Sequence, residues 1–178
     1  AVRDAVIADL VALLISEGSD GACGRAYRLP ALQSGFADFA FGATALDYAG
    51  DYLCSEMTLT HELGHNLGNA HNRTESGSDE VVFPYSYGFQ SPNKTFRTLM
   101  AYECSGGGCP RINQWANPAT TYKGEPTGID HTKDPANASD MVRSMNQARV
   151  LVSNFRADCV ATPPPGPMTN FAYMPVAV

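Results

Sequence analysis

The stretch HELGHNLGNAH, residues 61–71, holds three of the four histidines of this 178-residue chain. His61 and His65 are four residues apart, so on an α-helix both imidazoles project from one face and can bind one ion. Gly68 allows backbone angles closed to other residues, so the chain can leave the helix and bring His71 back as a third nitrogen ligand. Three neutral nitrogens keep Zn²⁺ a strong Lewis acid. The stretch therefore predicts a site for Zn²⁺, the one cofactor expected.

Glu62 stands beside the first histidine but points elsewhere. On a helix it is rotated by about 100° from His61, so it does not join the same ligand set. It can instead reach a water molecule at the open position of the ion. A structural zinc site is the alternative, but such sites prefer four protein ligands that include Cys. The pattern therefore favours a catalytic site with Glu62 as general base.

The composition is that of one globular domain, because 44% of the residues are hydrophobic and 17% are charged. A net charge of −6 without any run of Lys and Arg argues against nucleic acid as a partner. The most apolar run, residues 10–15, is too short to span a bilayer, so no membrane partner is expected. From Thr162 the chain reads Thr-Pro-Pro-Pro-Gly-Pro. This predicts a catalytic domain at 1–160 and a Pro-rich linker or tail at 161–178.

Hydrophobic periodicity predicts helices at both ends and strands between them. Apolar residues at helical spacing predict a helix over residues 3–16, and alternating aromatic residues predict strands at 25–29 and 37–45. Ser55 can cap a helix that runs through Leu67. Residues 72–98 lack sustained periodicity and are expected to be irregular. A last helix should begin near residue 138, with Asn137 as its cap, Asp140 in its first turn, and a buried seam of Met141, Met145, Ala148, Val152 and Phe155.

The histidine stretch resembles the extended zinc motif of the metzincin clan of metalloendopeptidases. Residues 98–102, Thr-Leu-Met-Ala-Tyr, resemble the clan's Met-turn, a tight turn that places a Met side chain beneath the metal. The likeness spans about residues 22–156 and is greatest to the reprolysin-like (adamalysin-type) subgroup and, within it, to bacterial peptidyl-Asp metalloendopeptidases. Residues 23–27, 85–88, 96–104 and 117–128 carry the likeness to this subgroup.

This resemblance implies an α+β fold of the metzincin type. A small, twisted, mostly parallel sheet would carry a backing helix and an active-site helix, and an irregular C-terminal subdomain would end in a helix. Metzincins usually place strands and a helix ahead of the segment that residues 2–16 resemble. We therefore expect the chain to begin inside the domain, after its first strands, with a reduced fold as the alternative.

The resemblance also implies roles for individual residues. The three motif histidines would bind the zinc, and Glu62 would act as general base and proton shuttle while a zinc-bound water attacks the peptide bond. Met100 would be a structural floor. Tyr102 would either ligate the zinc and stabilise the oxyanion, as the corresponding Tyr does in astacins and serralysins, or be a packed tyrosine. The chain would then be a monomeric endopeptidase that acts on peptides or proteins lying along residues 24–27. A non-catalytic zinc-bearing binding module is the alternative.

The five cysteines, taken together with the histidine stretch, favour an oxidising compartment and hence a secreted protein. Five buried thiols in a cytosolic protein are the alternative. Cys104 and Cys109 flank Ser-Gly-Gly-Gly, a spacing short enough for a local disulfide. Four cysteines allow three connectivities, and the choice of which cysteine to leave out multiplies that number by five. Proximity in the chain and the resemblance favour Cys23–Cys54 and Cys104–Cys109, which leaves Cys159 unpaired.

Substrate preference is the last expectation. Resemblance to the peptidyl-Asp enzymes suggests cleavage on the N-terminal side of Asp, which requires a basic group in the pocket beyond the scissile bond. A guanidinium suits this task because it can hold a carboxylate with two parallel hydrogen bonds. The basic candidates are Arg97, Arg111 and Lys123. The alternative is an apolar pocket lined by residues such as Leu99, Tyr102 and Tyr122.

Overall fold

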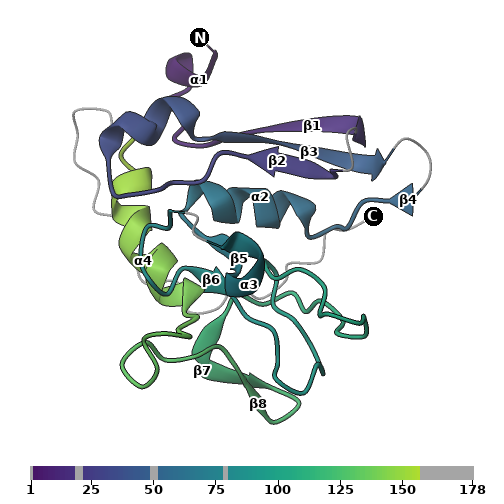
Figure 1. The fold of residues 1–178 in the computed structure, drawn as a ribbon. Helices are drawn as coiled ribbons and strands as arrows, with labels where there is room; N and C mark the ends of the chain where they lie inside the picture. The colour runs from purple at the N-terminus through teal and green to yellow at the C-terminus, as the bar shows by residue number, and fades with distance from the viewer. Residues whose placement is uncertain (1, 19–21, 49–51, 78–79, 157–178) are drawn as a thin grey trace.

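The computed structural model shows a small sheet above one central helix and a less regular region below it (Figure 1). The structure describes residues 2–18, 22–48, 52–77 and 80–156. The central strand β3 (Phe41–Tyr48) pairs in parallel with β1 (Val11–Gly18). On its other side β3 pairs antiparallel with β2 (Gly24–Ala26), and β4 (Tyr52–Leu53) pairs antiparallel with its end. β2 is therefore an edge strand.

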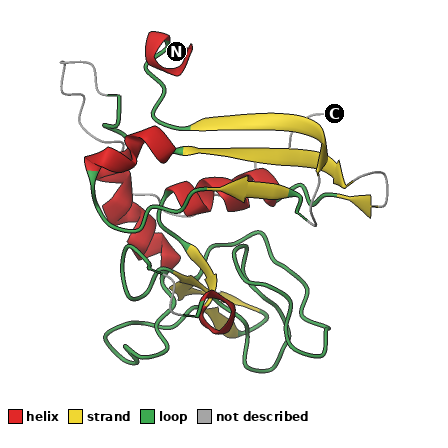
Figure 2. Cartoon of the chain, turned by 45° about the horizontal axis from the view of Figure 1, so that its top comes forward, coloured by secondary structure: helices red, strands yellow, loops and turns green. Residues whose placement is uncertain are grey.

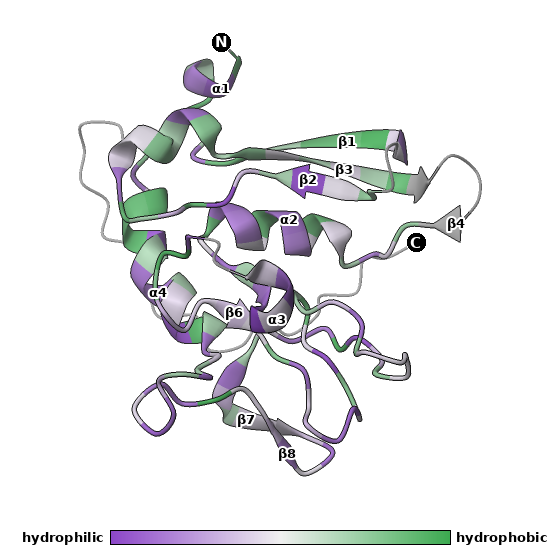
Figure 3. Ribbon diagram, viewed as in Figure 1, coloured by the Kyte–Doolittle hydropathy of each residue, from purple (hydrophilic) through white to green (hydrophobic). Residues whose placement is uncertain are grey.

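The helix predicted over residues 3–16 is wrong. Only α1 (Val2–Ala5) is helical there, and the apolar run that follows forms β1, which Figure 3 shows as largely hydrophobic. A short apolar run fits a strand as well as a helix, and here pairing with the backbone of β3 decides for the strand. The mixed α+β class is confirmed. The backing helix is absent from the described residues, and the sheet has one parallel and two antiparallel pairs of strands instead of being mostly parallel.

The two strands predicted next are both present with shifted ends. β2 is shorter than predicted, because the chain leaves the sheet after Ala26 and turns toward the central helix. Leu29 is fully buried there, and its N–H donates to the carbonyl of His65 at 3.0 Å. The second prediction, residues 37–45, begins as the 3₁₀ helix η1 (Ser34–Phe39) and continues as β3.

The central helix α2 (Thr58–Asn66) confirms the helix predicted between Ser55 and Leu67, but the predicted cap is wrong. Met57 is the N-cap residue, and Oγ of Ser55 accepts the N–H of Met57 at 3.2 Å instead of a helical N–H. The helix lies directly below the sheet and packs against β2 and β3 (Figures 1 and 2). Gly68 ends it with a φ of +88°, and a Cβ at this position would lie 2.4 Å from Cγ1 of Val82. The chain can therefore turn down into the lower region only because this residue is glycine.

The lower region contains little regular structure, which Figure 2 shows as loops around short elements. β5 (Ala70–Asn72) pairs in parallel with β6 (Tyr87–Gly88), and α3 (Arg73–Ser76) lies between them in sequence. β7 (Asn117–Tyr122) and β8 (Glu125–Thr127) form a hairpin. The prediction of irregular structure for residues 72–98 is confirmed apart from α3 and β6.

The last helix, α4 (Met141–Val152), joins two hydrophobic cores. Its first half packs into the lower core, and its second half packs against η1 in the upper core. The lower core consists of Phe89, Phe96, Leu99, Met100, Ile112, Trp115, Ala116, Met141 and Met145. The upper core consists of Leu29, Phe36, Ala40, Ala148 and Val152, with Phe155 packed against it. The predicted seam of α4 is therefore confirmed.

The predicted cap of α4 is wrong. Asp140, not Asn137, caps the helix, because its carboxylate accepts the N–H of Arg143 at 3.1 Å. Asn137 instead bonds to the carboxylate of Asp134. The cause is tertiary: Ser139 pairs with Ile129 in a β-bridge, so the helix cannot begin until this bridge has ended.

The described residues contain two disulfides, Cys23–Cys54 and Cys104–Cys109, the pairs expected from the sequence. The first joins the chain just before β2 to the chain just before α2. Cys159 and the tail predicted at 161–178 lie outside the described residues. No helix in the described part of the chain is long and apolar enough to cross a membrane.

Replacing Asp140 by Ala is expected to lower the free energy of unfolding by about 1 kcal/mol, the usual cost of losing a helix cap. Urea denaturation followed by circular dichroism measures the change. Asn137→Ala is the matched control and should change stability by less than half as much. Equal losses in the two variants would show that Asp140 does not cap α4.

Candidate metal centre and cleft

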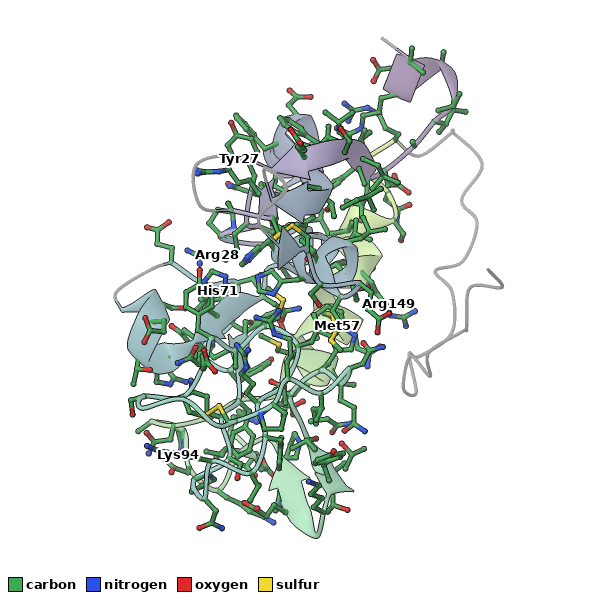
Figure 4. All side chains as sticks on the ribbon, turned by 90° about the vertical axis from the view of Figure 1, so that its right-hand side faces the viewer. Tyr27, Arg28, Met57, His71, Lys94 and Arg149 are labelled. Atoms are coloured by element: carbon green, nitrogen blue, oxygen red, sulfur yellow. A yellow bond between two sulfur atoms is a disulfide. The ribbon has the colours of Figure 1, made fainter. Side chains whose placement is uncertain are left out.

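Three imidazoles meet between α2 and β5. His61 and His65 project from one face of α2 with ring centroids 4.9 Å apart. His71, labelled in Figure 4, comes from β5, and its Nε2 lies 3.1 Å from Nε2 of His61. One nitrogen from each of the three rings lies within 4.8 Å of the others. The structure therefore brings the three motif histidines together.

Backbone carbonyls orient the two imidazoles of α2. Nδ1 of His61 lies 3.2 Å from the carbonyl oxygen of Leu99, and Nδ1 of His65 lies 2.8 Å from that of Asn69. A carbonyl oxygen can only accept, so each Nδ1 carries the proton and each Nε2 keeps a lone pair. Such bonds from the second ring nitrogen are typical of metal-binding histidines.

Burial keeps these two imidazoles neutral. It lowers the pKa of His61 to about 3, with smaller contributions from His65 and His71, and lowers the pKa of His65 to about 4. Two nitrogens bound to one tetrahedral Zn²⁺ at 2.0–2.1 Å lie about 3.3 Å apart. The 3.1 Å between Nε2 of His61 and His71 is close to that spacing. The three residues therefore fit a divalent metal ion.

Glu62 also comes from α2 but faces the edge strand β2. Its side chain is 6% exposed, and Oε1 lies 2.5 Å from the position that a Cβ on Gly24 would take. Burial raises the pKa of the carboxyl to about 7. A carboxylate that has lost much of its hydration is a stronger base than one in water.

The Met-turn segment, residues 98–102, packs against α2 from below. Met100 is fully buried, and its Sδ lies 2.8 Å from the position that a Cβ on Gly64 would take. The Trp115 ring touches the same position at 2.8 Å. Gly64 lies between the two helical histidines, so Met100 packs against the part of α2 that carries them. Its role as a structural floor beneath the metal stays a prediction.

Tyr102 is stacked on one of the candidate ligands. Its ring lies 4.1 Å from the ring of His71, centroid to centroid, at an angle of 27°. Its backbone N–H donates to Oδ1 of Asn72 at 2.9 Å, which joins the Met-turn segment to the residue after His71. Burial, reinforced by Glu62, raises the pKa of Tyr102. Tyr102 is 42% exposed and lines the same cleft as the three histidines, so both predicted roles stay predictions.

A cleft of about 800 Å³ opens at the three histidines and follows β2. Residues 22–27, Glu62, Tyr102 and Arg111 contribute to its walls. Of the basic candidates only Arg111 lines the cleft. Arg97 donates to the carbonyls of Cys109 and Ala101.

Three further candidates for the substrate pocket, Lys123, Tyr122 and Leu99, do not line the cleft. Lys123 lies over the ring of Tyr122, 5.5 Å from its centroid, and Tyr122 packs against Phe96. Leu99 is buried in the lower core. The apolar pocket proposed as an alternative is therefore not assembled around the cleft, since only Tyr102 of its three residues lines it.

Sequence reasoning missed Asn72 and the contact between Gly24 and Glu62. Asn72 directly follows the last motif histidine, and this adjacency was the one local signal for it. No local signal marks Gly24, because its contact with Glu62 joins residues far apart in the sequence.

Comparison with known proteins finds similarity over most of the chain. The Reprolysin_5 model of metallopeptidase family M12 matches residues 2–116. A peptidyl-Asp metalloendopeptidase of Stenotrophomonas maltophilia (strain R551-3) is 33% identical over 159 residues, which are 86% of this chain and 33% of the relative. One of Xanthomonas campestris pv. campestris is 37% identical over 95 residues, 53% of this chain and 21% of the relative. A chain in a solved structure of a chaperone–substrate complex superposes with a TM-score of 0.59 at 25% identity, over 88% of this chain and 22% of that chain. This chain thus spans about a third of the Stenotrophomonas relative.

Gly64→Ala is expected to destabilise the protein by roughly 1–3 kcal/mol, because the new methyl group overlaps Met100 and Trp115. The direction of the change in the free energy of unfolding is informative, because Ala in a helix is favoured over Gly by about 1 kcal/mol when space allows. Gly35→Ala is the control, as a Cβ there meets no atom within 4 Å. Thermal unfolding of both variants measures the difference. A Gly64→Ala variant as stable as the control would contradict the packing described.

Proposed function

The chain belongs to metallopeptidase family M12, and from this premise we propose that residues 1–160 form a metzincin-type catalytic domain that hydrolyses peptide bonds with a zinc ion. The observation that carries the proposal is the placement of a buried carboxylate, Glu62, in the wall of the same cleft as three converging imidazoles. A non-catalytic zinc-bearing module would have no use for a buried carboxylate at this position.

His61, His65 and His71 would hold the ion. When bound, zinc would supply a Lewis acid that polarises a carbonyl and lowers the pKa of water to roughly 7. Glu62 takes a proton from the attacking water and delivers it to the amine that leaves. The Met-turn segment keeps His61 oriented through the carbonyl of Leu99. One helix, α2, carries the base and two of the three ligands, which fixes the distances between them.

The substrate would lie along β2. This strand is at the edge of the sheet and borders the cleft, so an extended peptide can add to it through backbone hydrogen bonds. Backbone pairing tolerates most side chains. Selectivity then depends on the few side chains that project into the cleft.

Arg111 is the residue proposed to select Asp after the scissile bond. It alone of Arg97, Arg111 and Lys123 lines the cleft, and its buried Nε has no hydrogen-bond partner among the described residues. A guanidinium near the metal centre that has no carboxylate partner among the described residues is suited to bind the carboxylate of a substrate. The curated relatives are named peptidyl-Asp metalloendopeptidases, which agrees with this preference.

Secretion is proposed from the two disulfides, which persist in oxidising compartments. A monomer that binds neither nucleic acid nor membranes is proposed from the composition. Chromatography with light scattering tests the oligomeric state directly.

Glu62→Gln is expected to lower turnover of casein by roughly 10²–10⁴-fold, because the general base is lost while the ligands remain. Metal analysis should still find one zinc per chain. Glu56→Gln, on the exposed approach to α2, is the control and should keep wild-type turnover. Treatment with a chelator should abolish activity and lower the melting temperature of the wild type. Wild-type turnover by Glu62→Gln would contradict the proposed mechanism.

Arg111→Ala is expected to lower kcat/KM for substrates with Asp after the cut by roughly 10–100-fold, the cost of a lost charge-assisted hydrogen bond. Cleavage of an unbiased peptide library, with alignment of the cut sites, measures the preference. The wild type and Lys123→Ala should enrich Asp immediately after the cut, and Arg111→Ala should not. If the wild type enriched Leu or Phe immediately after the cut, the proposed Asp preference would be wrong. The endopeptidase proposal would not be affected.

A further inference from the structure

Glu62 occupies the space that a side chain on Gly24 would need. A Cβ built on Gly24 would lie 2.5 Å from Oε1, 2.7 Å from Cγ and 2.8 Å from Cδ of Glu62, which are its three nearest contacts. All three distances are shorter than carbon atoms tolerate in folded proteins. Cγ is near the root of the side chain, so the whole side chain of Glu62 would have to move, not only its end.

Backbone conformation does not explain the glycine. Gly24 is a strand residue whose φ is not in the left-handed region, so an L-residue could adopt its backbone angles. The absence of a side chain is needed for space alone. This distinguishes Gly24 from Gly68, where the positive φ demands glycine.

The strand cannot retreat from the helix at this point. Gly24 is in register with Thr44 of β3, and the carbonyl of the preceding Cys23 accepts the N–H of Ala45 at 2.7 Å. The disulfide from Cys23 to Cys54 holds the same place from the other side. α2 is equally restrained, because Gly64 rests against Met100 below it.

We propose that Gly24 is a positioning residue: its missing side chain leaves the space that fixes the Glu62 carboxylate beside the metal centre. This inference rests on the proposed function, in which Glu62 is the general base. Since both backbones are restrained, a methyl group at position 24 rotates the carboxylate away from its place. A shift of about 1 Å in a catalytic group commonly costs on the order of 100-fold in rate.

Gly24→Ala is expected to lower kcat about 100-fold with KM changed less than about 3-fold, because the base and not the substrate is displaced. Zinc content should remain one per chain. Gly35→Ala is the matched control and should keep wild-type kinetics, since its Cβ meets open space outside the cleft. Wild-type kcat in Gly24→Ala would overturn the inference.

A stability cycle gives a second readout that needs no activity. Gly24→Ala in the zinc-loaded protein should lower the melting temperature by roughly 2–6 °C when Glu62 is present, and by less than about 1 °C in a Glu62→Ala background. An equal loss in both backgrounds, or failure of both to fold, would overturn the inference. If Gly24→Ala failed to fold when Glu62 is present but folded in the Glu62→Ala background, the result would support the inference, because the loss would depend on the Glu62 side chain. If Glu62→Ala kept full turnover, the proposed function would fail while the coupling in melting temperature could still be seen.

Discussion

Close approach on both sides of α2 is the constraint on which the rest of this structure depends. Below the helix, Gly64 rests against Met100 and Trp115, and above it Glu62 fills the space beside Gly24. A side chain at either glycine would push the helix or its residues out of place. Dense packing of this kind transmits small displacements, because protein interiors are nearly as close-packed as organic crystals. The positions of the side chains on α2 therefore depend on two contacts, at Gly64 and Gly24, that involve none of the three histidines.

Orientation of the imidazoles depends on the lower region as much as on the helix. Leu99 of the Met-turn segment and Asn69 of the turn after α2 supply the carbonyls that face the two helical histidines. Tyr102 stacks on the third imidazole, and Asn72 accepts its backbone N–H. The lower region thus contributes hydrogen-bond acceptors and an aromatic face to the three histidines, although it contains little regular structure.

Long-range packing compensates for the small amount of regular structure. α4 contributes Met141 and Met145 to the lower core and Ala148 to the upper core, so a single helix links the two. Loops are joined by specific polar contacts, such as the Glu125 carboxylate that accepts from Ser91 and Thr95 and whose pKa these bonds lower. Such bonds satisfy polar groups that no sheet or helix would otherwise pair.

The sequence by itself determined the features that depend on near neighbours. The spacing of His61, His65 and His71, the end of α2 at Gly68 and the apolar seam of α4 all follow from periodicity within a dozen residues, which one helix or one turn is enough to produce. Only the tertiary structure decided that β1 is a strand, because its pairing partner lies about thirty residues away in β3. The same holds for the Asp140 cap, for the position of Arg111, alone among the three basic candidates, at the wall of the cleft, and for the contact of Gly24 with Glu62. Each of these depends on which distant backbone comes within contact, and side-chain chemistry read along one chain carries no information about that distance.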